Sequence, residues 1–473
     1  MSNFILQFMK EAPQGNPVVD RNIILVVTMV TSFFTPFMGS AVSIALPTIA
    51  KEFSLNAISM NWIMMSFLLS SAIFLVPFGK LADIVGRKKI FLIGNIILTL
   101  ATIFCALAVS GTSLIVFRFL QGIGSALIFS SSMAIITSVY PPHERGKAIG
   151  LNVTAVYLGL SVSPVIGGFL IHVIGWRSIF YLNALAGCFI ILAILLKMKA
   201  EWAEAKGEKF DFAGSIIYIF AISALMYGFS QLPKEYALIL TLTGIAGFVM
   251  FVMIENWSAN PVLNMRLFGQ NRKFAFSNAA ALINYAATFA VTTLLSLYLQ
   301  YIKGMKPQQA GLFLITQPAM MAIAASFSGR LSDKYDSGKI SSIGMALVVV
   351  GLTFLIFLDA DTSALYLTVS LLILGLGFGL FSSPNTNAVM GSVDKKYLGI
   401  ASATLATMRL SGQMISMAIA NMIMHIFLGN AKINPKNFNQ FIHSNGVSFL
   451  VFAGLCVFGV FAALIKSKKV IES

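Results

Sequence analysis

Long apolar runs dominate the chain, and short polar or charged stretches separate them. Each run is about 20 residues long, which is enough for an α-helix to cross the roughly 30 Å hydrocarbon core of a bilayer. A transmembrane β-barrel would instead show strands of about ten residues with alternating polarity. The pattern therefore predicts fourteen membrane-spanning helices, at residues 23–46, 57–79, 89–109, 113–138, 146–173, 177–197, 212–231, 236–254, 273–301, 308–328, 339–359, 363–391, 398–427 and 446–466.

The predicted helices form two sets of six, with two further helices between them. The fold class that follows is an all-α polytopic membrane protein. Its expected parts are a cytoplasmic N-terminal segment (1–22), an N-terminal six-helix bundle (23–197), a linker with two extra transmembrane helices (198–272), a C-terminal six-helix bundle (273–466) and a cytoplasmic tail (467–473).

A sequence repeat relates the two sets of six helices. The charged turn at residues 79–83, between two apolar runs, returns 250 residues later at residues 329–333. At an offset of 253, Gly146 matches Gly399, so separate places agree on the offset within three residues. Two similar halves are what an alternating-access transporter needs, with its substrate site between them near the middle of the membrane.

Composition and charge support a membrane protein and give its orientation. Of the 473 residues, 58 % are hydrophobic and 10 % charged, with a mean hydropathy of +0.86, whereas ordinary soluble domains are roughly 25 % charged. If the N-terminus is cytoplasmic, 23 of the 32 Lys and Arg residues fall in cytoplasmic segments and seven on the opposite side. This bias follows the positive-inside rule. The bias places both termini in the cytoplasm, as expected of a multi-pass plasma-membrane protein, and the net charge of +15 requires no nucleic-acid partner.

Other functional classes lack their sequence signals. No pair of metal ligands occurs at i,i+4 spacing and no phosphate-binding loop ends in Gly-Lys-Ser/Thr, so we expect no enzyme activity, cofactor or metal. Cys105, Cys188 and Cys456 lie in apolar helices, which argues against a disulfide framework. A non-transporting sensor or scaffold, the remaining alternative, is expected to carry a soluble domain, and the gaps between helices are too short for one.

Two arginines and three amides are candidates for the substrate cavity or the coupling site. Arg118, followed by Gln121, and Arg409 lie inside apolar runs, where a charge costs on the order of 2.5–3.5 kcal/mol and should face a cavity or a partner. Arg118 either contacts substrate or the proton-coupling machinery, or it is tied to backbone carbonyls of the first helix. Asn284 and Gln317 either reach a central cavity or form hydrogen bonds between helices.

The predicted helix at 146–173 contains a proline and several glycines. Pro164 frees a backbone carbonyl and bends a helix, while Gly159, Gly167 and Gly168 allow a neighbouring helix to approach closely. The segment is therefore either a hinge or a passive packing groove.

Taken together and in this order, the motifs resemble the major facilitator superfamily, and within it the fourteen-helix drug:proton antiporter branch of the EmrB/QacA type. The resemblance spans nearly the whole chain, except that Ser163 stands where the helix 5 antiporter motif usually has glycine. It rests on residues 79–89, 118–124, 159–168, 176–177, 298–300 and 310–311, together with Arg409 and Gly412.

The resemblance implies efflux of small, often amphipathic compounds in exchange for protons, by a monomer in the lipid bilayer. It also implies that Asp83 contacts the end of a helix in the other half and stabilises the outward-facing state; a carboxylate at a helix N-terminus contributes roughly 0.3–1 kcal/mol. Alternatively, the turn only sets the membrane topology. The residues assigned to gating on this basis are Gly79, Asp83, Gly86, Arg87 and Lys88 and, in the second half, Gly329, Arg330 and Asp333.

One expected residue of this branch is absent. An Asp is usual in the first helix, where this chain has Phe37, Met38 and Gly39, and none of the 17 acidic residues lies in the middle of a predicted span. Proton coupling normally needs a titratable group in the membrane. The chain is therefore either an exporter coupled through an unusual group, or a dedicated carrier of an anionic or neutral metabolite or lipid-like compound. A permanent dication is a poor substrate for a cavity with two arginines.

Overall fold

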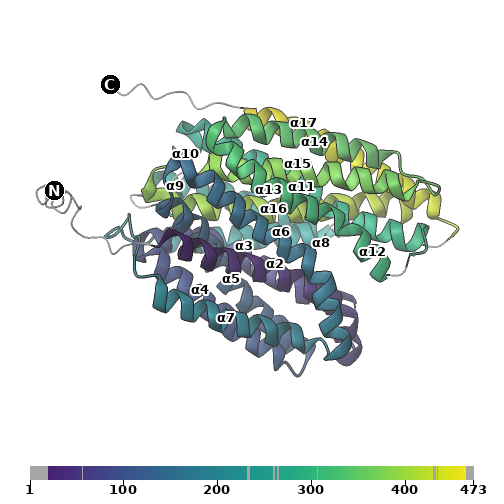
Figure 1. Ribbon diagram of the computed structural model, residues 1–473, viewed down its shortest axis with the longest axis horizontal. Coiled ribbons are helices and arrows are strands. Elements are labelled where there is room, and N and C mark those ends of the chain that lie inside the picture. Colours follow the sequence, from purple (N-terminus) through teal and green to yellow (C-terminus); the bar gives the residue numbers. More distant parts are fainter. Residues whose placement is uncertain are drawn as a thin grey trace, which may run out of the picture.

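The computed structural model describes residues 20–464, apart from residues 56, 232–234, 259–260, 264–265, 306, 430–432 and 434. Over these residues the regular structure is entirely helical (Figure 1). In chain order the helices are α2 (Arg21–Glu52), α3 (Ala57–Val85), α4 (Arg87–Ala106), α5 (Gly111–Val139), α6 (Pro142–Val173), α7 (Arg177–Lys197), α8 (Phe212–Gln231), α9 (Glu235–Trp257), α10 (Arg266–Gln270), α11 (Arg272–Leu297), η1 (Tyr298–Ile302), α12 (Pro307–Leu314), α13 (Thr316–Lys334), α14 (Ser337–Ile356), α15 (Ala364–Met390), η2 (Lys395–Tyr397), α16 (Leu398–Leu428) and α17 (Phe438–Leu464).

The predicted polytopic helical fold is confirmed, since a helix lies at each of the fourteen predicted ranges. Among the described residues, twelve helices are long and apolar enough to cross a membrane, and the bent α6 makes a thirteenth. The apolar part of α8, Phe212–Gly228, falls below that length. Fourteen spans therefore remain a prediction.

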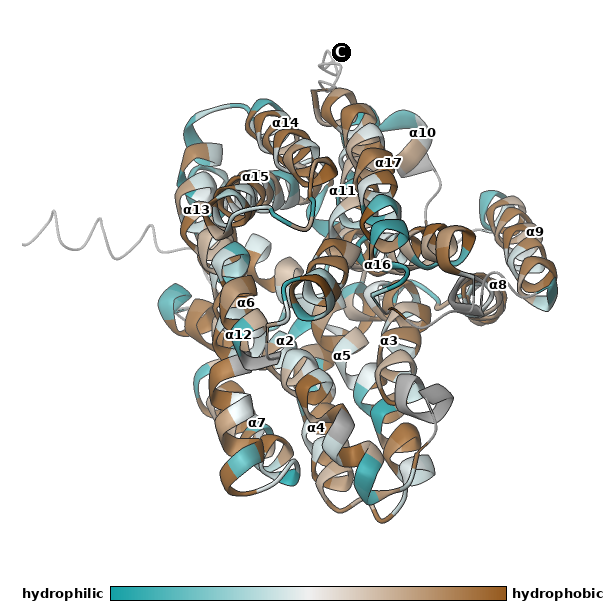
Figure 2. Ribbon diagram, turned by 90° about the vertical axis from the view of Figure 1, so that its right-hand side faces the viewer, coloured by the Kyte–Doolittle hydropathy of each residue, from teal (hydrophilic) through white to brown (hydrophobic). Residues whose placement is uncertain are grey.

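The helices gather into two groups that follow the chain. Helices α2 to α7 pack against one another, as do α11 to α17, and these groups form the lower and upper parts of the molecule in Figure 1. The groups meet mainly where α3 and α5 contact α16 and where α6 contacts α13. The inserted pair α8 and α9 lies at one side, with α8 against α3 and α16 (Figure 2).

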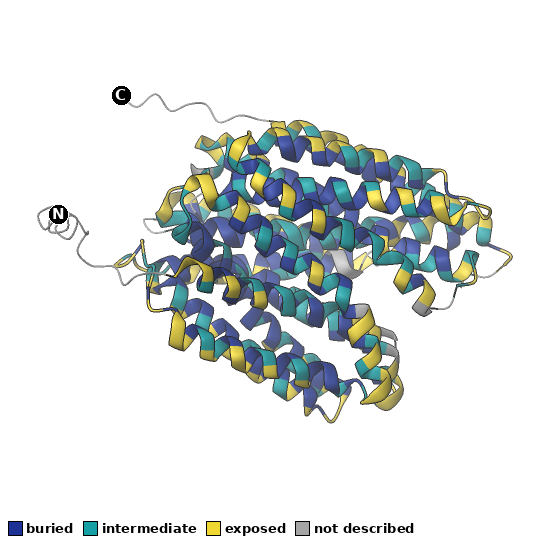
Figure 3. Cartoon of the chain, in the orientation of Figure 1, coloured by how far each residue is buried: buried dark blue, intermediate teal, exposed yellow. Residues whose placement is uncertain are grey.

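Apolar side chains fill the spaces between helices and also cover the outer surface. Figure 3 shows buried residues along the inner faces of the helices and exposed residues on the outer faces. Large exposed apolar side chains include Phe189, Phe220, Ile323 and Phe458. Such a surface suits a solvent of lipid tails, in which small residues and hydrogen bonds rather than apolar burial hold the helices together.

Candidate functional site

The end of α3 contacts the beginning of α16 through a carboxylate. Asp83 is fully buried, and its oxygens accept hydrogen bonds from the backbone N–H groups of Gly399 at 2.9 Å and Ile400 at 3.1 Å. The first N–H groups of a helix have no partner within the helix and carry its positive dipole end, so they form a natural carboxylate site. The contact implied by the family resemblance is therefore present in the structure.

Arg87, at the start of α4, neutralises this buried carboxylate. Its Nε and Nη2 atoms donate to Asp83 Oδ1 at 2.9 and 2.7 Å, and both side chains are completely shielded from solvent. Its remaining donors reach Ser138 Oγ at 2.6 Å and the carbonyl of Lys395 in the other half. A buried ion pair is tolerated only when its hydrogen-bonding groups are satisfied in this way, so the guanidinium depends on both halves being in contact.

A second contact repeats the first with the halves exchanged. Asp333, near the end of α13, accepts hydrogen bonds from the N–H groups of Gly146 at 2.6 Å and Lys147 at 2.8 Å near the start of α6. Asp333 is half-buried, and Arg330 one turn earlier is exposed. The two carboxylate contacts, which we call the first latch (Asp83) and the second latch (Asp333), therefore reflect the internal repeat.

Glycine pairs allow the helices to cross at each latch. A Cβ atom on Gly79 would lie 2.7 Å from the carbonyl oxygen of Gly399, and one on Gly399 would lie 2.5 Å from the carbonyl oxygen of Gly79. Gly329 and Gly146 approach one another in the same way, with both corresponding distances 2.5 Å. Since such contacts exclude any side chain, the crossings require glycine on both helices. The repeat had matched Gly146 with Gly399, but it did not predict their contacts.

The segment between α7 and α8 covers the turn of the first latch. Glu201 accepts hydrogen bonds from the N–H groups of Lys88 at 2.9 Å and Lys89 at 3.2 Å, and thereby caps α4. Gly86, with φ of +126°, allows the abrupt passage from α3 to α4. The Arg87 N–H group also donates to the carbonyl of Trp202 at 2.8 Å. This role of the linker was not predicted, because a polar segment with several charges gives no signal of its partners.

Glu208 of the same linker connects the two halves by charge. It pairs with Lys80 of α3 at 2.5 Å and with Lys396 of η2. Burial alone would raise the pKa of Glu208, but the hydrogen bonds from Lys396 and Lys80 outweigh it and lower that pKa below its ordinary value of 4.5. Glu208 therefore remains ionised at neutral pH and holds Lys80 and Lys396 together across the first latch.

We expect the Glu208 bridge to make closure at the first latch pH-dependent on the acid side. A carboxyl whose pKa is lowered in the closed state stabilises that state above its ordinary pKa, and this contribution is lost as the pH falls through the lowered value. The contribution of Glu208 to closure should be lost only below about pH 4.5 in the native protein. Glu208→Gln should weaken it already at neutral pH. The distance between spin labels at the exposed positions Lys89 and Asp394 reports this opening; an unchanged distance in Glu208→Gln would show that the bridge does not hold the halves together.

Arg118 forms a network inside the first bundle. It is completely buried, with Nε donating to the carbonyl of Ile63 at 3.1 Å, Nη1 donating to Gln121 Oε1 at 2.8 Å, and the guanidinium 4.4 Å from the centre of the Phe67 ring. Gln121 in turn donates to Thr102 Oγ1 at 2.7 Å. The alternative that tied Arg118 to backbone carbonyls of the first helix named the wrong helix. The carbonyl belongs to α3, which packs directly against α5.

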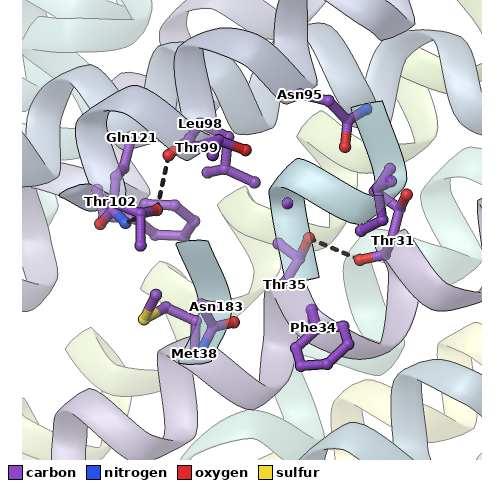
Figure 4. Close-up of a pocket in the computed structure, with 13 residues that line it drawn as sticks. Thr31, Phe34, Thr35, Met38, Asn95, Leu98, Thr99, Thr102, Gln121 and Asn183 are labelled. Atoms are coloured by element: carbon purple, nitrogen blue, oxygen red, sulfur yellow. Dashed lines mark hydrogen bonds between the residues drawn. The ribbon is translucent and has the colours of Figure 1, made fainter. Parts of the chain in front are cut away.

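The network borders a small cavity lined by α2, α3, α4, α5 and α7. Figure 4 shows Gln121 and Thr102 on one side of the cavity and Thr35 bonded to Thr31 on another. The cavity leaves about 30 Å³ in which a water molecule can be centred, which is room for roughly two waters. This volume is too small for an organic substrate in this conformation. The cavity also lies within one bundle and not between the two halves.

A second cationic side chain lies where the two halves meet. Arg409 of α16 donates from Nη2 to Thr386 Oγ1 at 2.9 Å, and its guanidinium lies 5.7 Å from the centre of the Tyr285 ring. Tyr285 packs edge-on against Phe378, with ring centres 5.2 Å apart, and Phe378 packs against Tyr157 of α6 at 6.0 Å. We call these five residues the interface cluster. It combines one positive charge with three aromatic rings from both halves and carries no carboxylate.

The two amides predicted for the cavity lie in the second bundle. The buried Asn284 donates to Met345 Sδ at 3.2 Å, which joins α11 to α14. Gln317 is buried near the start of α13. Its backbone carbonyl oxygen would lie 2.6 Å from a Cβ atom on Gly375, so α13 and α15 are in close contact here. For Asn284 the geometry matches the alternative of a hydrogen bond between helices.

The predicted hinge helix α6 bends and packs closely on α2. Its two parts, Pro142–Ser163 and Val165–Val173, make an angle of 41°; the side chain of Pro164 between them lies outside the described residues. A Cβ on Gly159 would lie 2.3 Å from the carbonyl oxygen of Phe33, and one on Gly167 would lie 3.1 Å from Ala41 Cβ, whereas Gly168 faces open space. A bend and close packing against α2 therefore both occur in this helix, and its role as a hinge stays a prediction.

Ser163, the residue that departs from the helix 5 motif, has a partner in the fold. The buried hydroxyl donates to the carbonyl of Phe37 in α2 at 2.8 Å. A hydrogen bond between helices thus occupies the place where the motif has a glycine, next to the position from which the expected acidic residue of the first helix is absent.

Comparisons with known proteins agree with this architecture. Multidrug resistance protein Stp of Mycobacterium tuberculosis is 29 % identical over 400 residues, covering 83 % of this chain and 74 % of the relative. Multidrug transporter protein MdtP of Bacillus subtilis is 29 % identical over 433 residues, covering 90 % of this chain and 78 % of MdtP. The crystal structure of the human organic anion transporter MFSD10 (TETRAN) has the same fold, with a TM-score of 0.64, 14 % identity and coverage of 95 % of this chain and 100 % of that one.

The family itself is identified by its sequence pattern. The Major Facilitator Superfamily matches residues 28–417 and, in an overlapping match, residues 277–470. The matched region contains both latches, the Arg118 network and the interface cluster. With this coverage, the chain belongs to the Major Facilitator Superfamily of membrane transporters.

Proposed function

We propose that this protein is a secondary active transporter of the multidrug-efflux type, which exports small amphipathic compounds by alternating access. The observation that carries the proposal is the pair of latches, in which each half presents a buried or half-buried carboxylate to a helix N-terminus of the other. Such contacts form or break as a unit when the halves rock, because interfaces of this kind are bistable. The multidrug relatives Stp and MdtP support the class of substrate.

The membrane orientation follows from the charge pattern. The latch end carries the basic turns of both halves, which the positive-inside rule assigns to the cytoplasm. In that orientation closed latches correspond to an outward-facing state in the plasma membrane, with both termini cytoplasmic. The proposal includes fourteen spanning helices, two six-helix bundles over 23–197 and 273–466, and the drug:proton antiporter branch, with α8 and α9 as the inserted pair and no enzyme activity.

We place the substrate at the interface cluster, between the halves. Three aromatic rings provide apolar contact surfaces, and Arg409 provides a cation whose hydrogen-bond partner among the described residues is a neutral hydroxyl. An anionic or neutral amphipathic aromatic compound matches these groups, whereas a permanent dication would be repelled. The same observation also supports a second candidate function, that of a dedicated carrier of an anionic metabolite or lipid-like compound.

Arg409→Gln is expected to reduce transport of anionic compounds about tenfold or more and to leave neutral compounds within about twofold, because one charge-assisted hydrogen bond contributes roughly 1.5–3 kcal/mol. Arg409→Lys, which keeps the charge, should retain part of the activity. Uptake of labelled compounds into inverted proteoliposomes measures the effect. An equal loss for anionic and neutral compounds would indicate that Arg409 holds the helices together and does not contact substrate.

Two experiments test the proposed function as a whole. Deletion of the gene, with toxicity profiles for cationic, neutral and anionic compounds, should sensitise the cell to several neutral or anionic amphipaths. Sensitisation to none would favour the dedicated carrier. Uptake into proteoliposomes with and without a pH gradient tests coupling, and strong gradient-driven transport of a dication would contradict the placement of the substrate at the interface cluster.

A further inference from the structure

Two carboxyl groups meet at the base of the inserted helix pair. Glu255 lies in the last turn of α9, and Asp211 immediately precedes α8. Both reach Gly214, where a Cβ atom would lie 2.2 Å from Glu255 Oε1 and 3.0 Å from Asp211 Oδ2. The sum of these distances places the two oxygens at most about 5 Å apart, where like charges interact strongly away from water. The site lies outside both six-helix bundles.

The two carboxyl groups differ in how well they are bonded. Asp211 accepts hydrogen bonds from the N–H group of Gly214 at 2.8 Å and from Ser258 Oγ at 2.9 Å. Glu255 is only 2 % exposed; Oε2 accepts from the N–H group of Leu263 at 3.1 Å, but Oε1 has no hydrogen-bond partner among the described residues. Oε1 of Glu255 therefore faces the Asp211 side without a hydrogen-bond donor of its own among the described residues, while the backbone N–H groups of Leu263 and Val262 stabilise the carboxyl only in part.

A cation described near the site is engaged with another carboxylate. Lys80 of α3 is the nearby cation, and its ammonium group is 2.5 Å from the carboxylate of Glu208. On α8, Tyr218 lies one turn beyond Gly214 and packs at a tilt against Phe251, with ring centres 5.3 Å apart. An ionised carboxylate is disfavoured by burial and by a like charge, and both conditions apply here. A proton on Oε1 removes the repulsion and gives this oxygen a hydrogen to donate.

We propose that Glu255 and Asp211 form a proton-binding site, which takes one proton from water at the latch end and holds it on Glu255 Oε1 beside the Asp211 carboxylate. The site binds a proton whether or not the chain exports drugs; its use as a coupling site rests on the proposed transport function. Loss of the proton would add one negative charge near Lys80, which also belongs to the Glu208 bridge across the first latch. Charge at the inserted helices would thereby affect closure of the two halves.

Infrared difference spectra of the purified protein in lipid, recorded between about pH 6 and pH 9, test the site directly. Exposed glutamates, with an ordinary pKa of 4.5, are ionised throughout this range. We expect a band of a protonated carboxyl that disappears at high pH. Glu255→Gln, whose amide oxygen can still accept from Leu263, should remove this band, whereas Glu235→Gln at the exposed start of the same helix should retain it. No such band in the native protein, or the same band in Glu255→Gln, would overturn the proposal.

Asp211→Asn provides a second measurement that does not require transport. Removal of the neighbouring negative charge should shift the midpoint of the Glu255 band toward lower pH, and an unshifted midpoint would refute the shared site. Transport then separates the two proposals. If the native protein shows the band and Glu255→Gln leaves the pH profile of transport unaltered, the proton site stands. The same result excludes it as the coupling site.

Discussion

Asp83→Asn is expected to reduce transport at least tenfold while the protein still inserts into the membrane. The substitution leaves Arg87 without a counter-charge in a completely buried position, and breaking a buried ion pair costs about 3–5 kcal/mol. Much of this cost applies only when the latch is closed, because opening exposes the guanidinium to water. The closed state therefore loses stability relative to the open state, and each 1.4 kcal/mol changes their ratio about tenfold. Uptake into proteoliposomes measures the rate, and protein in the membrane fraction measures insertion.

Asp336→Asn is the matched control for this substitution. Asp336 is exposed in the turn next to the second latch and caps α14 by accepting from Gly338 and Lys339, a role that asparagine performs equally well. We expect near-native transport from this variant. Normal transport by Asp83→Asn would show that the turn sets membrane topology and has no part in gating.

Gly329→Ala is expected to have an effect of similar size through sterics alone. The new methyl group would lie 2.5 Å from the carbonyl oxygen of Gly146 and 2.6 Å from the Cα atom of Gly150, so α13 and α6 cannot approach as they do here. The closed state should become rare and transport should fall about tenfold or more, since overpacking costs typically 1–3 kcal/mol. Transport and the distance between spin labels at the exposed positions Lys147 and Lys334 report these changes.

The control for the steric argument is Gly454→Ala in α17. A Cβ atom there meets no other atom within 4 Å, and alanine in a helix interior is favoured over glycine by roughly 1 kcal/mol. This variant should transport normally and be equally or more stable. If Gly329→Ala behaves like Gly454→Ala, the second latch is not a close contact during the transport cycle.

The features that could be predicted from the sequence are those repeated along it. Apolar runs predicted where helices lie, and the recurrence of Gly79 and Asp83 as Gly329 and Asp333 predicted two equivalent segments. The prediction that these segments are turns was wrong, because residues 79–83 and 329–333 continue α3 and α13 as helix. The partners in the other half are distant in sequence. A single sequence that is not aligned with relatives gives no measure of which distant residues lie close together in space. For this reason the repeat matched Gly146 with Gly399 without predicting that each faces the glycine of the opposite turn.

Charged groups in connecting segments left the weakest signal of their partners in the sequence. Glu208 lies in a polar linker where any charge is acceptable, so its bridge between Lys80 and Lys396 left no sequence pattern. Glu255 and Asp211 lie at helix ends and, by position alone, did not count as acids within the membrane. Their burial depends on how α8 and α9 pack against each other, which hydropathy does not describe. The predicted partner helix of Arg118 was wrong for the same reason, because hydropathy does not show which helices pack together.

The central claim is that two carboxylate latches hold the halves together in one of two conformations. Its most direct test is the distance distribution between spin labels at Lys89→Cys and Asp394→Cys, in a background without Cys105, Cys188 and Cys456, in lipid. We predict two populations, the shorter one matching this structure, with Asp83→Asn shifting the protein to the longer distance. A single distribution that is identical in the native background and in Asp83→Asn would contradict the account.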